Sequence, residues 1–221
     1  MLGRRERDVR RGLIIPPEIG PAMIVDGMLH PAWTLDFITH DPLVFANVVE
    51  HADKGVTDAI PMAQHVMQNF DQRLSWKDVE WLQSIWDGPI VLKGIQTVDD
   101  GLRAFDSGVQ GIGLSNHGGR QLDDAPTPVS LIEPVRQEIA DQATLVCDGG
   151  IRRGSDIVKA LALGADAVSL GRPYFLALGA AGEAGVDWLL DFLRDGLEQT
   201  MALTGCRSLD EIDRELVAWR R

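Results

Sequence analysis

A histidine and an arginine stand three residues apart in the stretch SNHGGRQLD, directly after an apolar run. Histidine titrates near neutral pH, so His117 could take a proton from a substrate. The planar guanidinium of Arg120 could hold a carboxylate through two parallel hydrogen bonds. The glycines between them would let the backbone approach a ligand closely, since neither carries a Cβ. The stretch therefore predicts a proton-transfer site for a carboxylate substrate, with an ordinary loop histidine as the alternative.

A second chemical signal is a lysine inside the apolar run IVLKGI. The charge of Lys93 is costly to bury, so the pattern predicts an anionic partner. The alternative is a lysine on a sheet edge whose ammonium group reaches water.

Two loops with glycine and arginine predict a phosphate site. The loop DGGIRRG follows an apolar run and precedes a helical pattern, and GRP follows the next apolar run. Backbone N–H groups at a helix start bind anions, and arginines add positive charge. Two ordinary turns between strand and helix are the alternative. The candidate ligands are Asp148, Gly149, Gly150, Ile151, Arg152, Gly171 and Arg172.

Strands and helices that alternate along the chain must position these residues. Apolar runs predict four strands, over Pro89–Gly94, Gly111–Asn116, Thr144–Gly150 and Ala167–Pro173. Helical patterns predict helices over Thr97–Gly108, Val129–Ala140, Ser155–Gly164 and Asp187–Leu203. A last helix is predicted from Ser208 onwards, where Glu211 stands at the spacing of a capping box. The alternation predicts an α/β fold with a parallel sheet, whose carboxyl edge would gather the candidate residues.

The first 75 residues differ from the rest because they are proline-rich and lack clean periodicity. This composition predicts a long irregular segment with short helices near Pro31–Thr39 and Pro42–Glu50. A clearer helical pattern follows over Leu74–Gly88. We interpret its apolar positions as core, with an aromatic stacking platform as the alternative. These positions are Trp76, Val79, Leu82, Ile85 and Trp86.

Composition narrows the class of protein. The 221 residues carry a net charge of −12, which argues against nucleic acid and anionic membrane surfaces as partners. The two cysteines give neither a disulfide framework nor a metal-binding spacing, so no metal site is predicted. No apolar stretch approaches the roughly 18 residues of a membrane span, and the basic N-terminus lacks the apolar core of a signal peptide. These features predict a reduced, cytoplasmic setting.

The motifs together resemble the FMN-dependent L-2-hydroxy-acid oxidoreductases, which include L-lactate dehydrogenases, glycolate oxidases and mandelate dehydrogenases. SNHGGRQLD is similar to the active-site signature of that family. VLKGI, DGGIRRGSDIVKALALGA and GRP are similar to its flavin-binding segments and stand in the same order, and the resemblance runs from Leu2 to about Arg207. It implies a flavoprotein oxidoreductase with FMN as cofactor and a small 2-hydroxy acid as substrate, with L-lactate as the first choice.

The resemblance also implies roles for single residues. His117 would be the catalytic base, and Arg120 and Arg5 would bind the substrate carboxylate. Lys93 would contact the pyrimidine edge of the flavin, and Ser115 would lie beside the ring. The ribityl chain and the phosphate would be held by the loop residues Asp148–Arg152 and Gly171–Arg172.

The family's fold is a (β/α)8 TIM barrel, and the chain resembles it only from just after the fourth strand. The expected architecture is therefore the C-terminal half of the barrel, about four βα units in residues 76–221, preceded by a long irregular active-site loop in residues 1–75. Half a barrel leaves strand edges unpaired, which predicts a homo-oligomer or a complementing N-terminal half.

Two rival functions stay open beside the enzyme. One is a flavin- or phosphate-binding remnant without turnover. The other is a β/α protein that binds a phosphorylated metabolite. The pairing of His117 with Arg120 counts against the second rival, since a bare phosphate site does not need it.

Overall fold

The structure is a computed structural model that describes residues 10, 20–40, 71 and 73–219. The chain divides into two compact units, Met1–Ser75 and Trp76–Arg221. The helix predicted near Pro42–Glu50 and the candidate substrate ligand Arg5 lie outside the described residues. Among the helices that are described, none is both long enough and apolar enough to cross a membrane.

The described part of the first unit contains two short helices, α2 (Pro21–Leu29) and α3 (Pro31–Thr39). Each begins with a proline, whose fixed φ suits the first helical turn. The hydroxyl of Thr34 joins them by donating to the carbonyl of Gly27 at 2.9 Å. The helix predicted at Pro31–Thr39 is confirmed, although neither of these two described helices has a buried residue.

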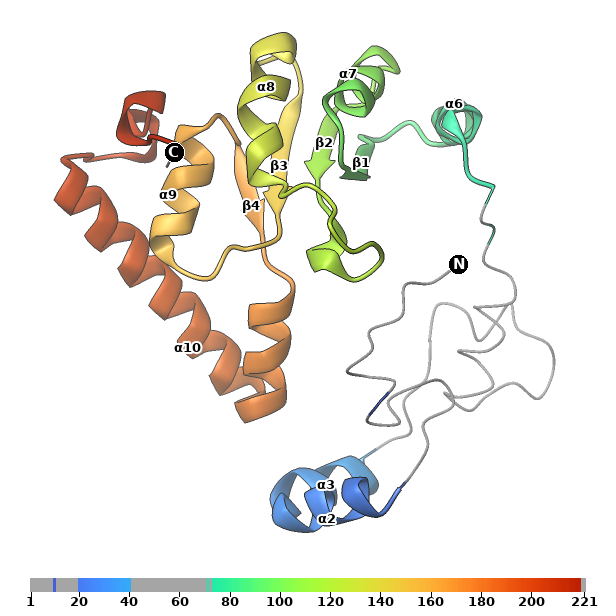
Figure 1. The fold of residues 1–221 in the computed structure, drawn as a ribbon, viewed down its shortest axis with the longest axis vertical. Helices are drawn as coiled ribbons and strands as arrows, with labels where there is room; N and C mark the ends of the chain where they lie inside the picture. The colour runs from blue at the N-terminus through green and yellow to red at the C-terminus, as the bar shows by residue number, and fades with distance from the viewer. Residues whose placement is uncertain (1–9, 11–19, 41–70, 72, 220–221) are drawn as a thin grey trace. The chain divides into compact units, whose positions relative to one another are not determined.

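The second unit is built on a parallel sheet whose neighbouring strands follow the order of the chain. Each strand overlaps its predicted run: β1 (Val91–Ile95), β2 (Gly111–Leu114), β3 (Thr144–Asp148) and β4 (Ala167–Ser169). Because the order never reverses, right-handed crossovers place the connecting helices on the same side of the sheet, as in a barrel. The described sheet therefore has the architecture of a partial α/β barrel (Figure 1).

The crossover helices are α7 (Val98–Asp106), α8 (Val129–Ile139) and α9 (Gly154–Ala162). Helices α7 and α8 each pack against both strands that they connect, and α9 packs against β4 (Figure 1). The start predicted for the first of them is confirmed, because the Thr97 side chain accepts the N–H of Asp100 at 3.1 Å.

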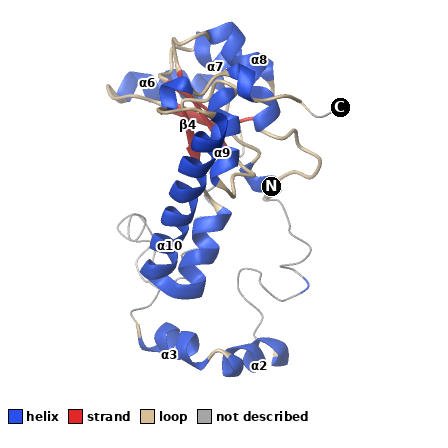
Figure 2. Ribbon diagram, turned by 90° about the vertical axis from the view of Figure 1, so that its left-hand side faces the viewer, coloured by secondary structure: helices blue, strands red, loops and turns tan. Residues whose placement is uncertain are grey.

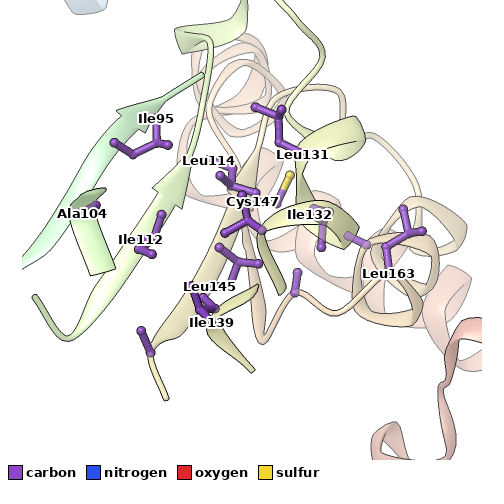
Figure 3. Packing of buried hydrophobic residues seen from close by; sticks show 14 of the residues in the cluster. Ile95, Ala104, Ile112, Leu114, Leu131, Ile132, Ile139, Leu145, Cys147 and Leu163 are labelled. Carbon is purple, nitrogen blue, oxygen red and sulfur yellow. The ribbon is translucent and has the colours of Figure 1, made fainter. Parts of the chain in front are cut away.

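The core lies between the sheet and these helices. Ile112 and Leu114 from β2 are fully buried, as are Leu145 and Cys147 from β3. The parallel register pairs Ile112 with Leu145 and Leu114 with Cys147, so the two strands are locked at one level. They pack with side chains from α7 and α8, among them Ala104, Ile132 and Ile139 (Figure 3). This packing fixes the level at which each strand ends, and therefore the level of the residues that follow it.

The helix α10 (Arg172–Thr204) is longer than the amphipathic stretch predicted at Asp187–Leu203 and has two limbs. Ala181 (φ −149°) and Gly182 (φ 59°) leave the helical region and break it. Figures 1 and 2 show the chain doubling back at this point. The second limb packs along α9, where Gly154 lies against its backbone.

The helix predicted from Ser208 onwards is wrong. The structure has two short 3-10 turns there, Leu209–Glu211 and Arg214–Leu216. The predicted capping box does not form, because the carboxylate of Glu211 accepts the N–H of Arg207 at 2.7 Å instead of that of Ser208. Ile212 then takes an extended conformation and is buried against α9. This tertiary contact is favoured over a continuous helix in this stretch.

The helix α6 (Trp76–Ile85) confirms the predicted helix but not all of its predicted burial. Val79 is buried, and Trp76 is half-buried with the guanidinium of Arg103 over its ring at 4.8 Å. The other predicted core residues are exposed, namely Leu82 at 39%, Ile85 at 62% and Trp86 at 58%. Their interpretation as core is wrong within the described part of the chain, because α6 meets the core only through the side that carries Val79 and Trp76.

Candidate active site

Three neighbouring strands supply one hydrogen-bonded cluster toward the carboxyl edge of the sheet. Lys93 is the middle residue of β1, Ser115 follows β2 and Asp148 ends β3. The ammonium of Lys93 lies 2.7 Å from Asp148 Oδ2 and donates to Ser115 Oγ at 2.9 Å. Ser115 Oγ in turn donates to Asp148 Oδ1 at 2.7 Å. The register of β2 and β3 sets Ser115 and Asp148 at one level, and the long side chain of Lys93 reaches both from two residues below, at the level of Gly113 and Val146.

Lys93 has the anionic partner that its sequence context predicted, and Asp148 supplies it. The side chain of Lys93 is 56% exposed and that of Asp148 is 14% exposed. The lysine therefore also fits the alternative of an edge residue that reaches water, since β1 is an edge of the described sheet. Sequence reasoning missed this ion pair because β2 lies between the two strands and nothing in the sequence gives their relative level.

The turn that carries the histidine has a left-handed backbone. The 3-10 turn η1 spans His117–Gly119, with φ of 54° at His117 and 64° and 69° at the two glycines. A positive φ at a residue with a side chain costs about 1–3 kcal/mol, so the surrounding structure must hold it. The N–H of His117 donates to Ser115 Oγ at 3.0 Å and contributes to that hold.

The side chain of His117 is exposed and, as far as the structure describes the chain, makes no hydrogen bond or ion pair. Arg120, one residue past the turn, is half-buried. A histidine base works best when a carboxylate fixes its tautomer and stabilises the imidazolium. The described residues supply no such carboxylate at His117.

A further contact joins the histidine turn to the start of α10. Arg172 Nη2 donates to the carbonyl of Gly118 at 2.8 Å, across 54 residues of sequence. Sequence reasoning assigned Arg172 to phosphate and did not foresee this bond, because it depends on the path of the loop after β2. The bond brings the histidine turn next to the helix start that is expected to hold an anion.

The glycine loop after β3 has a backbone that only glycine adopts readily. Gly149 and Gly150 have φ of 85° and 89°. A Cβ on Gly149 would lie 3.3 Å from Asn116 Oδ1, whereas nothing lies within 4 Å of a Cβ on Gly150. Asn116 Oδ1 is itself a buried oxygen without a hydrogen-bond partner among the described groups, and sequence reasoning passed over it. The loop is therefore packed on one side and open on the other.

The start of α9 is partly occupied by the protein itself. The N–H groups of Arg152 and Arg153 both donate to Asp156 Oδ2 at 3.1 Å. Ile151 is 6% exposed and belongs to the core, so only its backbone could serve a ligand. Sequence reasoning missed both points because they depend on the direction of side chains.

These residues fit an anionic cofactor that carries a phosphate. Arg152 and Arg172 are exposed, one just before α9 and the other at the first position of α10. Helix starts carry positive partial charge and free N–H groups, which favour phosphate. Nothing lies within 4 Å of a Cβ on Gly171, so the approach to α10 is open. Fold and site together indicate a class of protein: a partial α/β barrel with two helix starts and exposed arginines suited to a phosphate group, close to a turn that carries an exposed histidine.

Comparison with a family model narrows this class to one family. The model described as FMN-dependent dehydrogenase matches residues 1–219. The chain belongs to the FMN-dependent dehydrogenase family, and FMN is the cofactor of that family.

Individual relatives agree with this assignment. A protein of Mycobacterium tuberculosis (strain ATCC 25618 / H37Rv), provisionally named L-lactate dehydrogenase, is 42% identical over 95% of this chain and 49% of its own length. The peroxisomal (S)-2-hydroxy-acid oxidase GLO4 of Oryza sativa subsp. japonica is 43% identical over 98% of this chain and 53% of its own length.

Among solved structures, the monotopic membrane protein (S)-mandelate dehydrogenase matches with a TM-score of 0.89 and 36% identity, over 97% of this chain and 56% of that one. The chain therefore spans about half the length of the curated relatives it matches.

Proposed function

We propose that this chain carries the histidine base and the phosphate-binding half of a site for FMN-dependent oxidation of a small L-2-hydroxy acid to the 2-oxo acid. The observation that supports this is the cluster of Lys93, Ser115 and Asp148, whose serine also holds the turn that presents His117. L-lactate is the first substrate to test, because the M. tuberculosis relative bears the name of a lactate dehydrogenase. The names of the other two relatives support the wider class of 2-hydroxy acids.

The oxidation removes the hydroxyl proton of the substrate and a hydrogen with two electrons from its C–H bond. FMN, when bound, supplies the acceptor for those two electrons. An imidazole nitrogen of His117 would take a proton from the substrate. The guanidinium of Arg120 would hold the substrate carboxylate, and Arg5, outside the described residues, would share that role.

The cofactor would be held from both ends. Lys93 would meet the pyrimidine edge of its ring and stabilise negative charge there when the ring is reduced. Ser115 and Asp148, which share a hydrogen bond of 2.7 Å, would lie beside the ring and the ribityl chain. The phosphate would be held at the helix starts beside Arg152 and Arg172.

A binding experiment tests the phosphate end. FMN and riboflavin are titrated against the full chain, and FMN should bind more tightly because only FMN has the phosphate. Arg152→Gln should weaken FMN binding about tenfold or more, since it removes a charged donor, and leave riboflavin binding unchanged. The matched control is Arg194→Gln, on α10 and 66% exposed, which should change neither. Equal affinities of the unaltered chain for FMN and riboflavin would refute the phosphate assignment.

An activity experiment tests the base. We expect negligible oxidation of L-lactate by the chain alone with FMN and an artificial acceptor. Loss of the orienting carboxylate costs related triads about 10⁴ in kcat, and none is present at His117 among the described residues. Turnover should rise when the N-terminal half of a relative is added, and His117→Ala should then abolish it. Fast turnover by the chain alone would show that copies of the chain complete the site.

We also propose that the chain associates, with further copies of itself or with a complementing half. β1 and β4 are the edges of the described sheet, and Val91 on β1 is 55% exposed. Unpaired strand edges favour association. Gel filtration with light scattering should show a dimer or a larger species, and a cooperatively melting monomer would contradict this.

A cytoplasmic location completes the proposal. The two free thiols, of Cys147 and Cys206, suit a reducing compartment. Fractionation of the cells that make the protein tests this, and recovery in the membrane pellet would count against it.

A further inference from the structure

We infer that Asn116 is a positioning residue, whose side chain closes the loop from His117 to Pro126 into a ring. This loop carries His117 and Arg120, to which the proposed function assigns contact with the substrate. The inference rests on that function where the substrate is concerned. Asn116 holds these two residues in place through the backbone of the loop, and its own side chain is not a substrate ligand.

The first argument is the hydrogen bond that closes the loop. Asn116 Nδ2 donates to the carbonyl of Pro126 at 3.2 Å, across ten residues of sequence. Within the part of the chain that the structure describes, no other hydrogen bond reaches residues 122–126. One carboxamide therefore sets the distance between the two ends of the loop.

The second argument is strain inside the loop. His117 has a φ of 54° and Asp124 a φ of 58°, and residues with a side chain keep such values only when their surroundings hold them. The Arg172 bond to the Gly118 carbonyl restrains the near end of the loop. The Asn116 bond restrains the far end, so its loss should let the whole loop relax while the sheet beneath it stays intact.

The third argument is the other side of the same carboxamide. Only the nitrogen of a carboxamide can donate to the Pro126 carbonyl, which leaves Oδ1 for the side of Gly149. This oxygen is buried and would lie 3.3 Å from a Cβ on Gly149, and the ring of Pro128 would lie 3.5 Å from the same Cβ. The carboxamide of Asn116 therefore sets the loop after β2 against the glycine turn after β3.

The first experiment needs no flavin. Amide hydrogen exchange of the full chain is followed by NMR for the unaltered protein and for Asn116→Ala. The N–H of Gly119 donates to the backbone carbonyl of Asn116 at 3.0 Å, an acceptor that the variant keeps. Exchange at Gly119 should nevertheless become about fivefold faster, because the loop around it loosens. Exchange at Ile112, in β2, should stay unchanged.

The variant Asn116→Asp separates the hydrogen bond from the volume of the side chain. A carboxylate has the shape of the carboxamide but no donor, whereas a neutral carboxyl group can donate its O–H to the Pro126 carbonyl. Exchange at Gly119 should therefore be fast at pH 7 and return at least halfway to the unaltered rate at about pH 4, near the ordinary pKa of an aspartate. The alanine variant should stay fast at both. Each rate is compared with that of the unaltered chain at the same pH, which removes the effects of His117 and Asp148.

A matched control removes another carboxamide that bonds the backbone. Gln110, at an exposed position before β2, donates to the carbonyl of Gly108 at 2.9 Å, and Gln110→Ala should leave exchange at Gly119 unchanged. Unaltered exchange at Gly119 in both Asn116 variants, equal acceleration at Gly119 and Ile112, or no recovery of Asn116→Asp in acid would overturn the inference. If the alanine variant does not fold, the aspartate variant decides alone through its recovery.

The second experiment measures turnover of L-lactate, with FMN and the N-terminal half of a relative added. Asn116→Ala should lower kcat/KM about tenfold, because the loop no longer holds His117 and Arg120 in one geometry. The Kd for FMN should rise less than about threefold, since the loop holds substrate groups rather than phosphate groups. Equal losses in kcat/KM and in FMN affinity would overturn the substrate-side role. If the unaltered chain shows no turnover, the proposed function fails, and the exchange experiment still decides whether Asn116 closes the loop.

Discussion

Replacing Gly154 by alanine should strongly destabilise the second unit, because two helices approach each other there backbone to backbone. A Cβ on Gly154 would lie 1.9 Å from the amide nitrogen of Leu197 and 2.0 Å from the carbonyl carbon of Gly196. Real Cβ contacts essentially never fall below 3.0 Å, so α9 and α10 would have to separate by at least the difference, 3.0 minus 1.9 or about 1.1 Å. The obstacle is main chain on both helices, and no rotamer change can relieve it.

The expected cost follows from that separation. Overpacking a core costs about 1–3 kcal/mol and occasionally more. Separating the helices would also loosen the contacts of Leu197 and Met201 on α10 with Val158 and Ala162 on α9. We therefore expect Gly154→Ala to lower the free energy of unfolding by about 3 kcal/mol or more. This corresponds to a fall in Tm of roughly 6–12 °C for a chain of this size.

Two alanine substitutions on α10 serve as controls in the same thermal and urea unfolding assay, followed by circular dichroism. A Cβ on Gly196 would lie 3.2 Å from the Gly154 nitrogen, so Gly196→Ala should cost less. Nothing lies within 4 Å of a Cβ on Gly179, so alanine there should gain roughly 0.5–1 kcal/mol of helix propensity. From highest to lowest, the expected order of Tm is Gly179→Ala, the unaltered chain, Gly196→Ala and Gly154→Ala. An unchanged Tm for Gly154→Ala would refute the close approach of the two helices.

Two further predictions concern titratable groups. The hydrogen bond from Arg214 at 2.5 Å, and next that from Trp219 at 3.2 Å, lower the pKa of Glu133 from its ordinary 4.5. The stability that this carboxylate adds is therefore present above pH 4.5 and is lost as pH falls through the lowered pKa. Glu133→Gln should therefore have a lower Tm than the unaltered chain at pH 7, and the difference in Tm should shrink in acid. A difference in Tm that does not change with pH would contradict this. Burial, with the charge of Asp148 as a lesser cause, raises the pKa of the Cys147 thiol to about 12. A disulfide reagent at pH 8 should therefore modify only Cys206 in the native chain and both thiols in urea, and native reaction of Cys147 would be the contrary result.

Much of the fold could be read from local patterns. The four apolar runs became strands because residues such as Ile112 and Leu145 lose contact with water on any packed sheet, whatever its partners. Thr97 caps α7 because capping involves only neighbouring residues. The helix expected after Ser208 failed for the opposite reason, since its fate depended on whether Ile212 could be buried against α9. Leu82, Ile85 and Trp86 failed in the same way, because spacing shows which side of a helix is apolar but not whether anything covers it.

The sequence by itself determined which chemical groups stand at the strand ends. Parallel strands separated by crossover helices expose their carboxyl ends at one edge, so the order of residues along the chain is enough to assign Lys93, Ser115, His117, Asp148 and Arg172 to one site. Only the tertiary structure decided how these groups pair, because a pairing depends on register, on strand order and on the direction of side chains. The Lys93–Asp148 ion pair, the Ser115–Asp148 hydrogen bond and the Arg172 bond to Gly118 each join segments that are distant in the sequence, at distances under 3 Å. Hydrogen bonds tolerate errors of only a few tenths of an ångström, and spacing along the chain cannot fix positions so closely.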